Sequence, residues 1–398
     1  MRRCAALLLA LLAPTASACS YAAPAPLERI SQPAQGALVG STDLFWAGVV
    51  DLAEGTVRSE FPTPSVVSPD GRWVAFARAG PDVQAGPTRV VDTCGTHLSR
   101  HLLALDRETG RLVMVDAGPV WAMGAVDEGV ATFDAREMRV YRWGSWELAR
   151  TVDARGIVEA HAWRDRIPLS PEGAHAIAWK RDSLHLFSLP ERSSRALDAD
   201  GASAFAWTFS PDGRHLALVF ANAAGTELRV LRASDLTVVA RDALETPSAE
   251  LAWGAGGLAL RIARPHHEEA RVVVRSYADA ERLAGAVERG IAGSGPEGAA
   301  WDLRGGLAWD PRGGTLAVST AIDDDEARVV VLDARLRELR DVTVRLLPSD
   351  TAAWQERAAQ QVPVPEYSAL ERARVPALPV ALLVLAAALA LAALSRRG

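Results

Sequence analysis

Cysteine and lysine are scarce in this chain of 398 residues, which has three cysteines and a single lysine, Lys180. Removal of an N-terminal leader of the kind described below would leave only Cys19 and Cys94. That pair cannot supply the disulfide framework on which small secreted domains depend. We therefore expect a fold held by a large hydrophobic core, for which the 49% hydrophobic composition is ample.

Clusters of basic residues are missing from the interior of the sequence, and the net charge is −6. Binding of nucleic-acid phosphates requires a positive surface. The composition therefore excludes nucleic acid as an expected partner.

The sequence also lacks a G-x-S-x-G nucleophile elbow, and no stretch is left over that is long enough for an α/β-hydrolase domain. Gly293-Ser294-Gly295 is instead typical of a flexible loop. No cofactor motif is present, and we expect none to be bound.

The N-terminus predicts a secretory signal peptide over residues 1–18. Two arginines precede a short apolar run, Ala5–Ala13, and the small residues Ala16-Ser17-Ala18 follow it. The run is too short to span a bilayer. Cys19 follows the expected cleavage site and is a candidate for lipidation, although Ala16 replaces the leucine that is usual before such a cysteine.

The C-terminus predicts a membrane anchor. Residues 375–395 are apolar on all sides, which a core helix would not be, and residues 396–398 form a basic end. A bacterial sorting tail, which is later removed, has the same form. We expect an exported protein anchored to the cell membrane, with its folded part in the periplasm or outside the cell.

A four-residue turn recurs between these ends at a spacing of roughly 45 residues, which is typical of propeller blades. Proline presets one backbone dihedral of the turn, and glycine accepts a positive φ. An alternating strand follows each turn, so each copy predicts a β-hairpin. The copies are Ser68-Pro69-Asp70-Gly71, Ser170-Pro171-Glu172-Gly173, Ser210-Pro211-Asp212-Gly213 and Asp310-Pro311-Arg312-Gly313, with weaker ones at Asp127-Glu128-Gly129 and Ala255-Gly256-Gly257 and a degenerate unit at Pro33-Ala34-Gln35-Gly36.

A second turn follows each hairpin at a fixed distance, as in Leu105–Leu112, so each unit has four strands. Trp207, Trp253 and Trp309 each precede a first turn, and Trp163 lies slightly further from its turn. These rings could form a ligand platform, but the repeat favours packing between blades, because every blade needs such a spacer.

The S-P-D-G turn before an alternating strand resembles the TolB-like, WD40-like propeller repeats, over roughly Gly36–Leu346. The resemblance implies an all-β propeller of four-stranded blades that serves as an interaction platform or carries a separate catalytic domain; it does not imply one function. Seven blades are favoured and six are the alternative. We place the N-terminal linker at 19–35, the propeller at 36–347 and a juxtamembrane stalk at 348–374.

Candidate sites are few. Cys94, His97 and His101 have a spacing that a metal could use, but no second pair of ligands matches them, so an exposed loop is favoured. Asp323–Glu326 and His266–Glu269 are interpreted as polar loop tips.

The leading functional hypothesis is a non-enzymatic module that binds or scaffolds a protein or a cell-envelope polymer. The alternative is a propeller hydrolase or lyase that uses acidic residues of the central funnel, such as Asp302 or Asp310. Neither the ligand nor the oligomeric state can be read from the residues.

Overall fold

The structure, a computed structural model, describes residues 30–345 apart from 35–36, 42–45, 53–54, 63–64, 80–99, 117–119, 121, 135, 158–166, 181–182, 198–202, 223–224, 246–248, 265–270, 293–305, 311–313 and 322–325. The predicted signal peptide, Cys19, the stalk and the C-terminal anchor lie outside the described residues. Trp163 and the segments 266–269 and 293–295 also fall in these gaps.

The described strands form seven antiparallel sheets, each made of strands that follow one another in the chain. Sheet 1 contains β1 (Ile30–Ala34), β2 (Ala37–Ser41), β3 (Trp46–Asp51) and β4 (Thr56–Pro62); sheet 2 contains β5 (Ser65–Val67), β6 (Trp73–Ala79), β7 (Arg100–Asp106) and β8 (Leu112–Asp116). Sheet 3 contains β9 (Ala122–Val126), β10 (Gly129–Phe133), β11 (Glu137–Arg142) and β12 (Leu148–Asp153); sheet 4 contains β13 (His175–Lys180), β14 (Ser183–Ser188) and β15 (Ser193–Ala196). Sheet 5 contains β16 (Ser203–Phe209), β17 (His215–Asn222), β18 (Gly225–Arg232) and β19 (Val238–Leu244). Sheet 6 contains β20 (Ala249–Gly254), β21 (Gly257–Arg264), β22 (Arg271–Asp279) and β23 (Ala284–Ala292); sheet 7 contains β24 (Leu307–Trp309), β25 (Leu316–Ala321), β26 (Glu326–Leu332) and β27 (Glu338–Arg345).

Six of these sheets are four-stranded blades, as the repeat predicts. Sheet 4 has three strands, and an isolated bridge from Leu169 to Ala176 lies beside its first strand. The first strand of sheet 1 begins at Ile30, before the predicted start at Gly36, and pairs antiparallel with β2.

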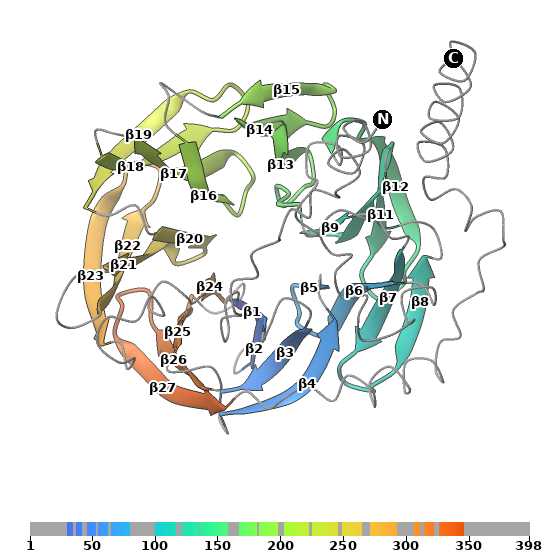
Figure 1. The fold of residues 1–398 in the computed structure, drawn as a ribbon, viewed down its shortest axis with the longest axis horizontal. Coiled ribbons are helices and arrows are strands. Elements are labelled where there is room, and N and C mark those ends of the chain that lie inside the picture. Colours follow the sequence, from blue (N-terminus) through green and yellow to red (C-terminus); the bar gives the residue numbers. More distant parts are fainter. Residues whose placement is uncertain are drawn as a thin grey trace, which may run out of the picture.

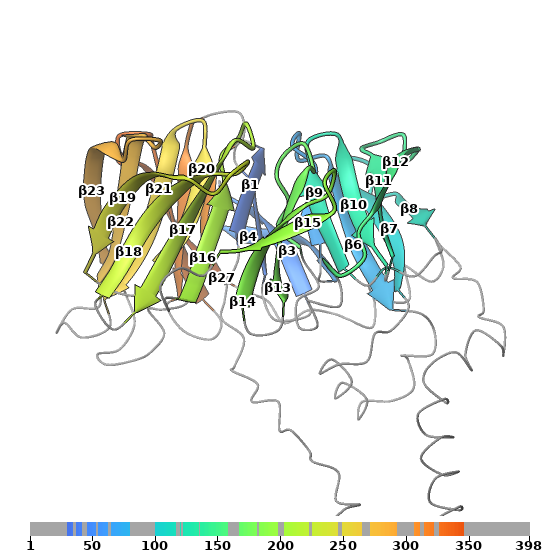
Figure 2. The ribbon, with the colours of Figure 1, turned by 90° about the horizontal axis from the view of Figure 1, so that it is seen from above.

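The sheets follow one another around a ring, and the chain is a β-propeller (Figure 1). In each four-stranded sheet the first strand lies nearest the axis and the last strand lies at the rim. The side view shows the strands running between the two faces of the ring (Figure 2). Sheet 7 returns to sheet 1, where β24 contacts β1 and β27 contacts β4.

The hydrophobic core lies between the sheets rather than inside any one of them. In each core cluster of the described residues, side chains from two neighbouring sheets pack together. Val130 of sheet 3 packs with Leu102 of sheet 2, and Val329 of sheet 7 packs with Val50 of sheet 1. A single four-stranded sheet cannot bury both of its apolar faces, so stacking around a ring is what removes them from water.

The Pro-x-Gly turns have the geometry that the sequence predicts. Gly71, Gly173 and Gly213 all have φ near 70°, where a residue with a Cβ is disfavoured. Each turn is closed by a bond from the glycine N–H to the serine carbonyl, of 2.7 to 2.9 Å. The serine hydroxyl then accepts a 2.9 Å bond from the first residue of the next strand, as in His215 N–H to Ser210 Oγ.

The turn between the third and fourth strands carries a second repeated feature. At least one residue between the last two strands of every sheet has a positive φ: Gly55, Gly110, Gly144 and Trp146, Arg192, Leu236, Leu283 and Leu336. A left-handed conformation costs a residue with a Cβ about 1 kcal/mol. Leu336 offsets this cost by inserting its side chain, 3% exposed, into the interface with the preceding sheet.

Candidate functional site

Of the candidate metal and catalytic residues, His101 and Asp310 fall in the described part of the chain. Cys94, His97 and Asp302 lie outside it. His101 lies on β7 and is 1% exposed, and no group of three or more His, Cys, Asp or Glu among the described residues could hold a metal ion. Asp310 is completely buried at the end of β24, so its carboxyl group does not line an open funnel.

The tryptophans of the repeat pack between sheets, as predicted. Trp207 packs against the core cluster between sheets 4 and 5, and Trp253 against the cluster between sheets 5 and 6. Trp309 is buried between sheets 6 and 7, where its indole N–H donates a 3.2 Å bond to the carbonyl of Ala252. Trp253 remains partly exposed, and the surface around it is considered below.

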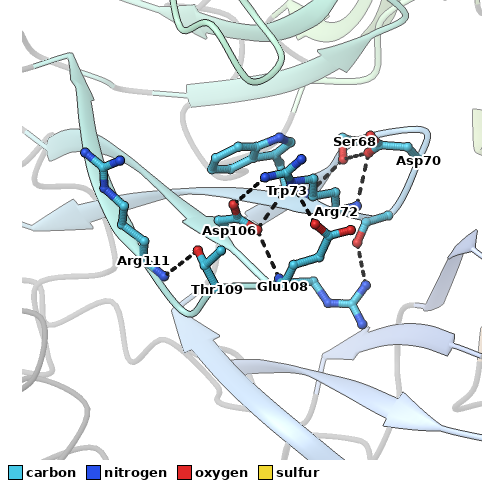
Figure 3. A network of polar contacts seen from close by, with 10 residues as sticks. Ser68, Asp70, Arg72, Trp73, Asp106, Glu108, Thr109 and Arg111 are labelled. Atoms are coloured by element: carbon cyan, nitrogen blue, oxygen red, sulfur yellow. Dashed lines mark hydrogen bonds and ion pairs between the residues drawn. The ribbon is translucent and has the colours of Figure 1, made fainter.

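We call the turn before the second strand of a sheet its first turn and the turn before the fourth strand its second turn. Both lie at the same end of each sheet, because the strands alternate in direction. We call this end of the ring the turn face. In sheet 2 its two turns are joined by a polar network (Figure 3). Arg72 donates a 2.8 Å bond to Asp106, and Arg107 donates a 2.5 Å bond to the carbonyl of Gly71.

These contacts have an electrostatic consequence for Asp106. The hydrogen bond from Arg72 lowers the pKa of this buried carboxyl group, and the backbone N–H of Glu108 assists. Asp106 therefore remains ionised and holds the two turns together. The two turns of sheet 2 thus form one hydrogen-bonded surface.

Acidic side chains run from turn to turn across sheets 3 to 6 on the turn face. The backbone N–H of Asp127 donates a 2.8 Å bond to the carbonyl of Pro171, which joins the first turns of sheets 3 and 4. A Cβ placed on Gly213 would collide with the Glu172 carboxylate, which therefore covers the turn of sheet 5. Partial burial and the charge of Glu172 raise the pKa of Asp127. We call Asp127, Glu172, Asp212 and Glu281 the acidic arc.

The arc ends at a hollow of about 390 Å³ between sheets 5 and 6. Its described walls come from the first turn of sheet 5, the β20–β21 hairpin and the second turn of sheet 6, and none of the described residues that line it is basic. They comprise Ser210, Pro211, Asp212, Trp253, Gly254, Ala255, Gly257, Ala278, Asp279, Ala280 and Glu281.

The aromatic wall of this hollow is held in place. The Trp253 ring stacks on His215, with centroids 6.3 Å apart and an angle of 27° between the planes. His215 Nδ1 in turn lies 3.5 Å from Glu281 Oε1. The hydrogen bond from Ser210 lowers the pKa of Asp212, so this carboxylate stays anionic. The hollow therefore combines an indole with three carboxylates.

The corresponding place between sheets 2 and 3 is filled with aromatic rings. Trp73 and Trp146 make an edge contact with centroids 5.1 Å apart, and Trp143 contacts Trp146 at 5.9 Å. By strand register, Trp143 stands near the position of Asp279. Trp73 occupies the position of His215, because each is the first residue of its strand and donates its N–H to the serine of the preceding turn. The hollow is therefore a property of these residues and not of the propeller as such.

A second depression, between sheets 3 and 4, contains Arg155 and Arg192. Both guanidinium groups approach the same carboxylate, Asp153, at 2.5 and 3.5 Å. Asp153 compensates one of these two positive charges, and the only aromatic residue among the described lining residues is Phe187.

The sequence did not single out the acidic arc. Asp212 and Glu172 were visible only as turn residues, and Asp279 and Glu281 carried no motif. The usable signal was the phase of the repeat, which places all first turns on one face of the ring.

No family model matches this chain, and no curated protein sequence matches it. Among solved structures, it resembles Kuenenia stuttgartiensis hydrazine synthase at 15% identity and a TM-score of 0.49, covering 81% of this chain and 99% of the other. It resembles the WD40 repeats of RRP9 at 11% identity and a TM-score of 0.45, covering 75% and 92% of the two chains. It resembles the Cps50 (Swd1) β-propeller domain of Myceliophteria thermophila at 13% identity and a TM-score of 0.45, covering 78% of this chain and 96% of the other. These similarities concern the fold alone.

No described helix is long and apolar enough to cross a membrane.

Proposed function

We propose that this chain is a non-enzymatic binding or scaffolding propeller that recognises a basic segment of a protein partner on its turn face. The observation that carries the proposal is the acidic arc of Asp127, Glu172, Asp212 and Glu281. β-Propellers commonly serve as scaffolds for protein interactions, but fold alone does not assign a function.

Charge and order both favour this surface as a docking site. Carboxylates of one sign along a surface attract a basic partner and orient its approach. The first turns that carry Asp127, Glu172 and Asp212 are fixed by backbone hydrogen bonds of 2.7 to 2.9 Å, so little conformational entropy is lost there on binding. Arg214 lies next to the arc, but its side chain is 81% exposed and lies 3.8 Å from Asp212, so it screens the arc only weakly.

The proposal includes the finer organisation expected from the sequence. The ring has seven blades, with Leu169 supplying the inner strand of sheet 4; its bridge to Ala176 supports this assignment. The S-P-D-G turns support membership of the TolB-like group. The signal peptide at 1–18 and the apolar segment at 375–395 support display on the outer side of the cytoplasmic membrane.

Cross-linking of the full chain in intact cells, followed by mapping of the linked residues, tests the proposal. We expect links to fall on the turns of sheets 3 to 6 and to decrease when Glu172 and Glu281 are both changed to lysine. Reversal of Glu108 in sheet 2 and Glu326 in sheet 7, acidic residues outside the turns of sheets 3 to 6, is the matched control. Links on other surfaces, or equal capture by both double variants, would contradict the proposal.

A further inference from the structure

The hollow between sheets 5 and 6 has the shape and charge for one particular kind of side chain. It opens on the turn face, holds about 390 Å³ and has Trp253 in its wall beside Asp212, Asp279 and Glu281. We infer that this hollow binds an arginine side chain of the partner, with the guanidinium plane against Trp253 and its N–H groups directed at the carboxylates. This inference rests on the proposed function and names the chemistry of its central contact.

The carboxylates are only partly compensated within the chain. Glu281 is 62% exposed, and its one described partner, His215, lies at 3.5 Å. Asp279 accepts a 3.2 Å bond from the backbone N–H of Arg282 and lies 3.3 Å from its guanidinium group. The Arg282 side chain is 82% exposed, and such ion pairs contribute little in water. Acceptor capacity therefore remains on both residues for a cation that enters the hollow.

Guanidinium fits these walls better than an ammonium group. It is planar, stacks on aromatic faces and presents paired donors that match carboxylates, whereas a lysine ammonium is a compact and strongly hydrated point charge. A cation over an indole gains further attraction from the ring quadrupole. The stacking of Trp253 on His215 fixes the indole before the ligand arrives.

The aromatic cluster between sheets 2 and 3 supports the specificity of the hollow. There the space next to the first turn is occupied by Trp73, Trp143 and Trp146, and the Trp146 ring contacts each of the other two. The first turn of sheet 2, Ser68–Gly71, has the same geometry as the first turn of sheet 5. It therefore serves as an internal comparison.

Titration of the full chain with the peptide Ac-Gly-Arg-Gly-amide tests the inference. The readout is the indole N–H resonance of Trp253 in protein labelled with 15N-tryptophan, assigned by Trp253→Phe. We expect a saturable shift of this resonance with the arginine peptide, a weaker effect with the lysine peptide and none with the citrulline peptide, which has nearly the same shape but no charge.

A carboxylate variant provides the second measurement. The Asp279→Asn, Glu281→Gln double variant keeps the side-chain shapes and should weaken binding of the arginine peptide at least tenfold. The control variant Glu108→Gln should leave the affinity unchanged. Equal shifts with arginine and citrulline, no shift of Trp253, or unchanged affinity of the double variant would each overturn the inference. If the peptide fails while cross-links still fall on the acidic arc, only this inference is lost; if the peptide binds but cross-links fall elsewhere, only the proposed function is lost.

Discussion

Tyr141 on β11 donates a hydrogen bond of 2.5 Å to Asp116 on β8, across the interface between sheets 2 and 3. Arg139, two residues earlier on the same strand, donates a 2.6 Å bond to the same carboxylate oxygen. The arrangement recurs between sheets 5 and 6, where Tyr277 and Arg275 both bind Asp242. An Arg-x-Tyr pair on a third strand therefore fastens the fourth strand of the preceding sheet at two places in the ring.

The first prediction concerns alkaline pH. Burial, and then the hydrogen bond to the Asp116 carboxylate, raise the pKa of Tyr141 to about 12; burial and Asp242 raise the pKa of Tyr277 to about 12. The unfolded chain loses these protons near pH 10. The stabilisation is therefore complete below about pH 10 and is lost as pH rises toward 12.

Urea unfolding at a series of pH values checks this expectation. The unfolding midpoint should fall between about pH 10 and pH 12 in the wild type. It should fall less steeply in the Tyr141→Phe, Tyr277→Phe double variant. Equal slopes in the two proteins would contradict the assignment.

The second prediction concerns the acceptor of this clasp. Asp116→Asn removes a charge that is 12% exposed and bonded to both Arg139 and Tyr141, and should lower the free energy of unfolding by about 1–3 kcal/mol. Asp341→Asn is the control, because its 2.5 Å pair with Arg328 is more exposed, at 34%, and should contribute about 0–1 kcal/mol. Urea unfolding of both variants and the wild type checks this difference: the midpoint should fall clearly for Asp116→Asn and little for Asp341→Asn.

The third prediction compares the serines of the first turns. Ser68→Ala and Ser210→Ala each leave a backbone N–H of the next strand without its acceptor, which costs about 1–3 kcal/mol. Ser170→Ala should cost less, because Ser170 lacks the additional bond to a turn carboxylate that Ser210 makes with Asp212 at 2.6 Å. Urea unfolding should rank the variants in that order, with the exposed Ser145→Ala unchanged.

The fourth prediction separates backbone strain from packing in the second turns. Glycine at position 336 relieves the left-handed backbone, worth about 1 kcal/mol, but removes a buried side chain worth about 2–5 kcal/mol. Leu336→Gly should therefore destabilise the protein. Leu283→Gly, at the same turn position but only partly buried, should be nearly neutral. A stabilised Leu336→Gly would show that strain outweighs packing.

Much of the fold was predictable because its signal is local. The proline, aspartate and glycine of the S-P-D-G turn each favour one backbone geometry, and Gly71, Gly173 and Gly213 adopt it. The packing role of Trp309 also followed from the repeat. The second turns were harder to recognise in the sequence, because Leu236 and Leu336 occupy a left-handed position where glycine is expected. The cost of that backbone conformation is offset by packing against the neighbouring sheet, which the local sequence does not reveal.

The candidate site was not predictable, because it is made of residues that are ordinary in their own turns. Glu281 becomes part of a site only when sheet 6 brings it to Trp253 and Asp212. Such proximity depends on how one sheet is rotated against the next, which is not encoded in any single repeat. The Arg-x-Tyr clasps were missed for the same reason.

Sheet 1 and sheet 7 are each complete within consecutive stretches of chain, and Val50 and Leu52 pack against Val329 and Val344 where the two sheets meet. No strand of the described residues crosses that junction. The contacts between neighbouring sheets in the ring therefore matter more for the fold than the order in which the chain connects the sheets. A circularly permuted chain, opened between two other sheets and joined from Arg345 to Ile30 by a linker that reaches from rim to axis, should assemble the same propeller.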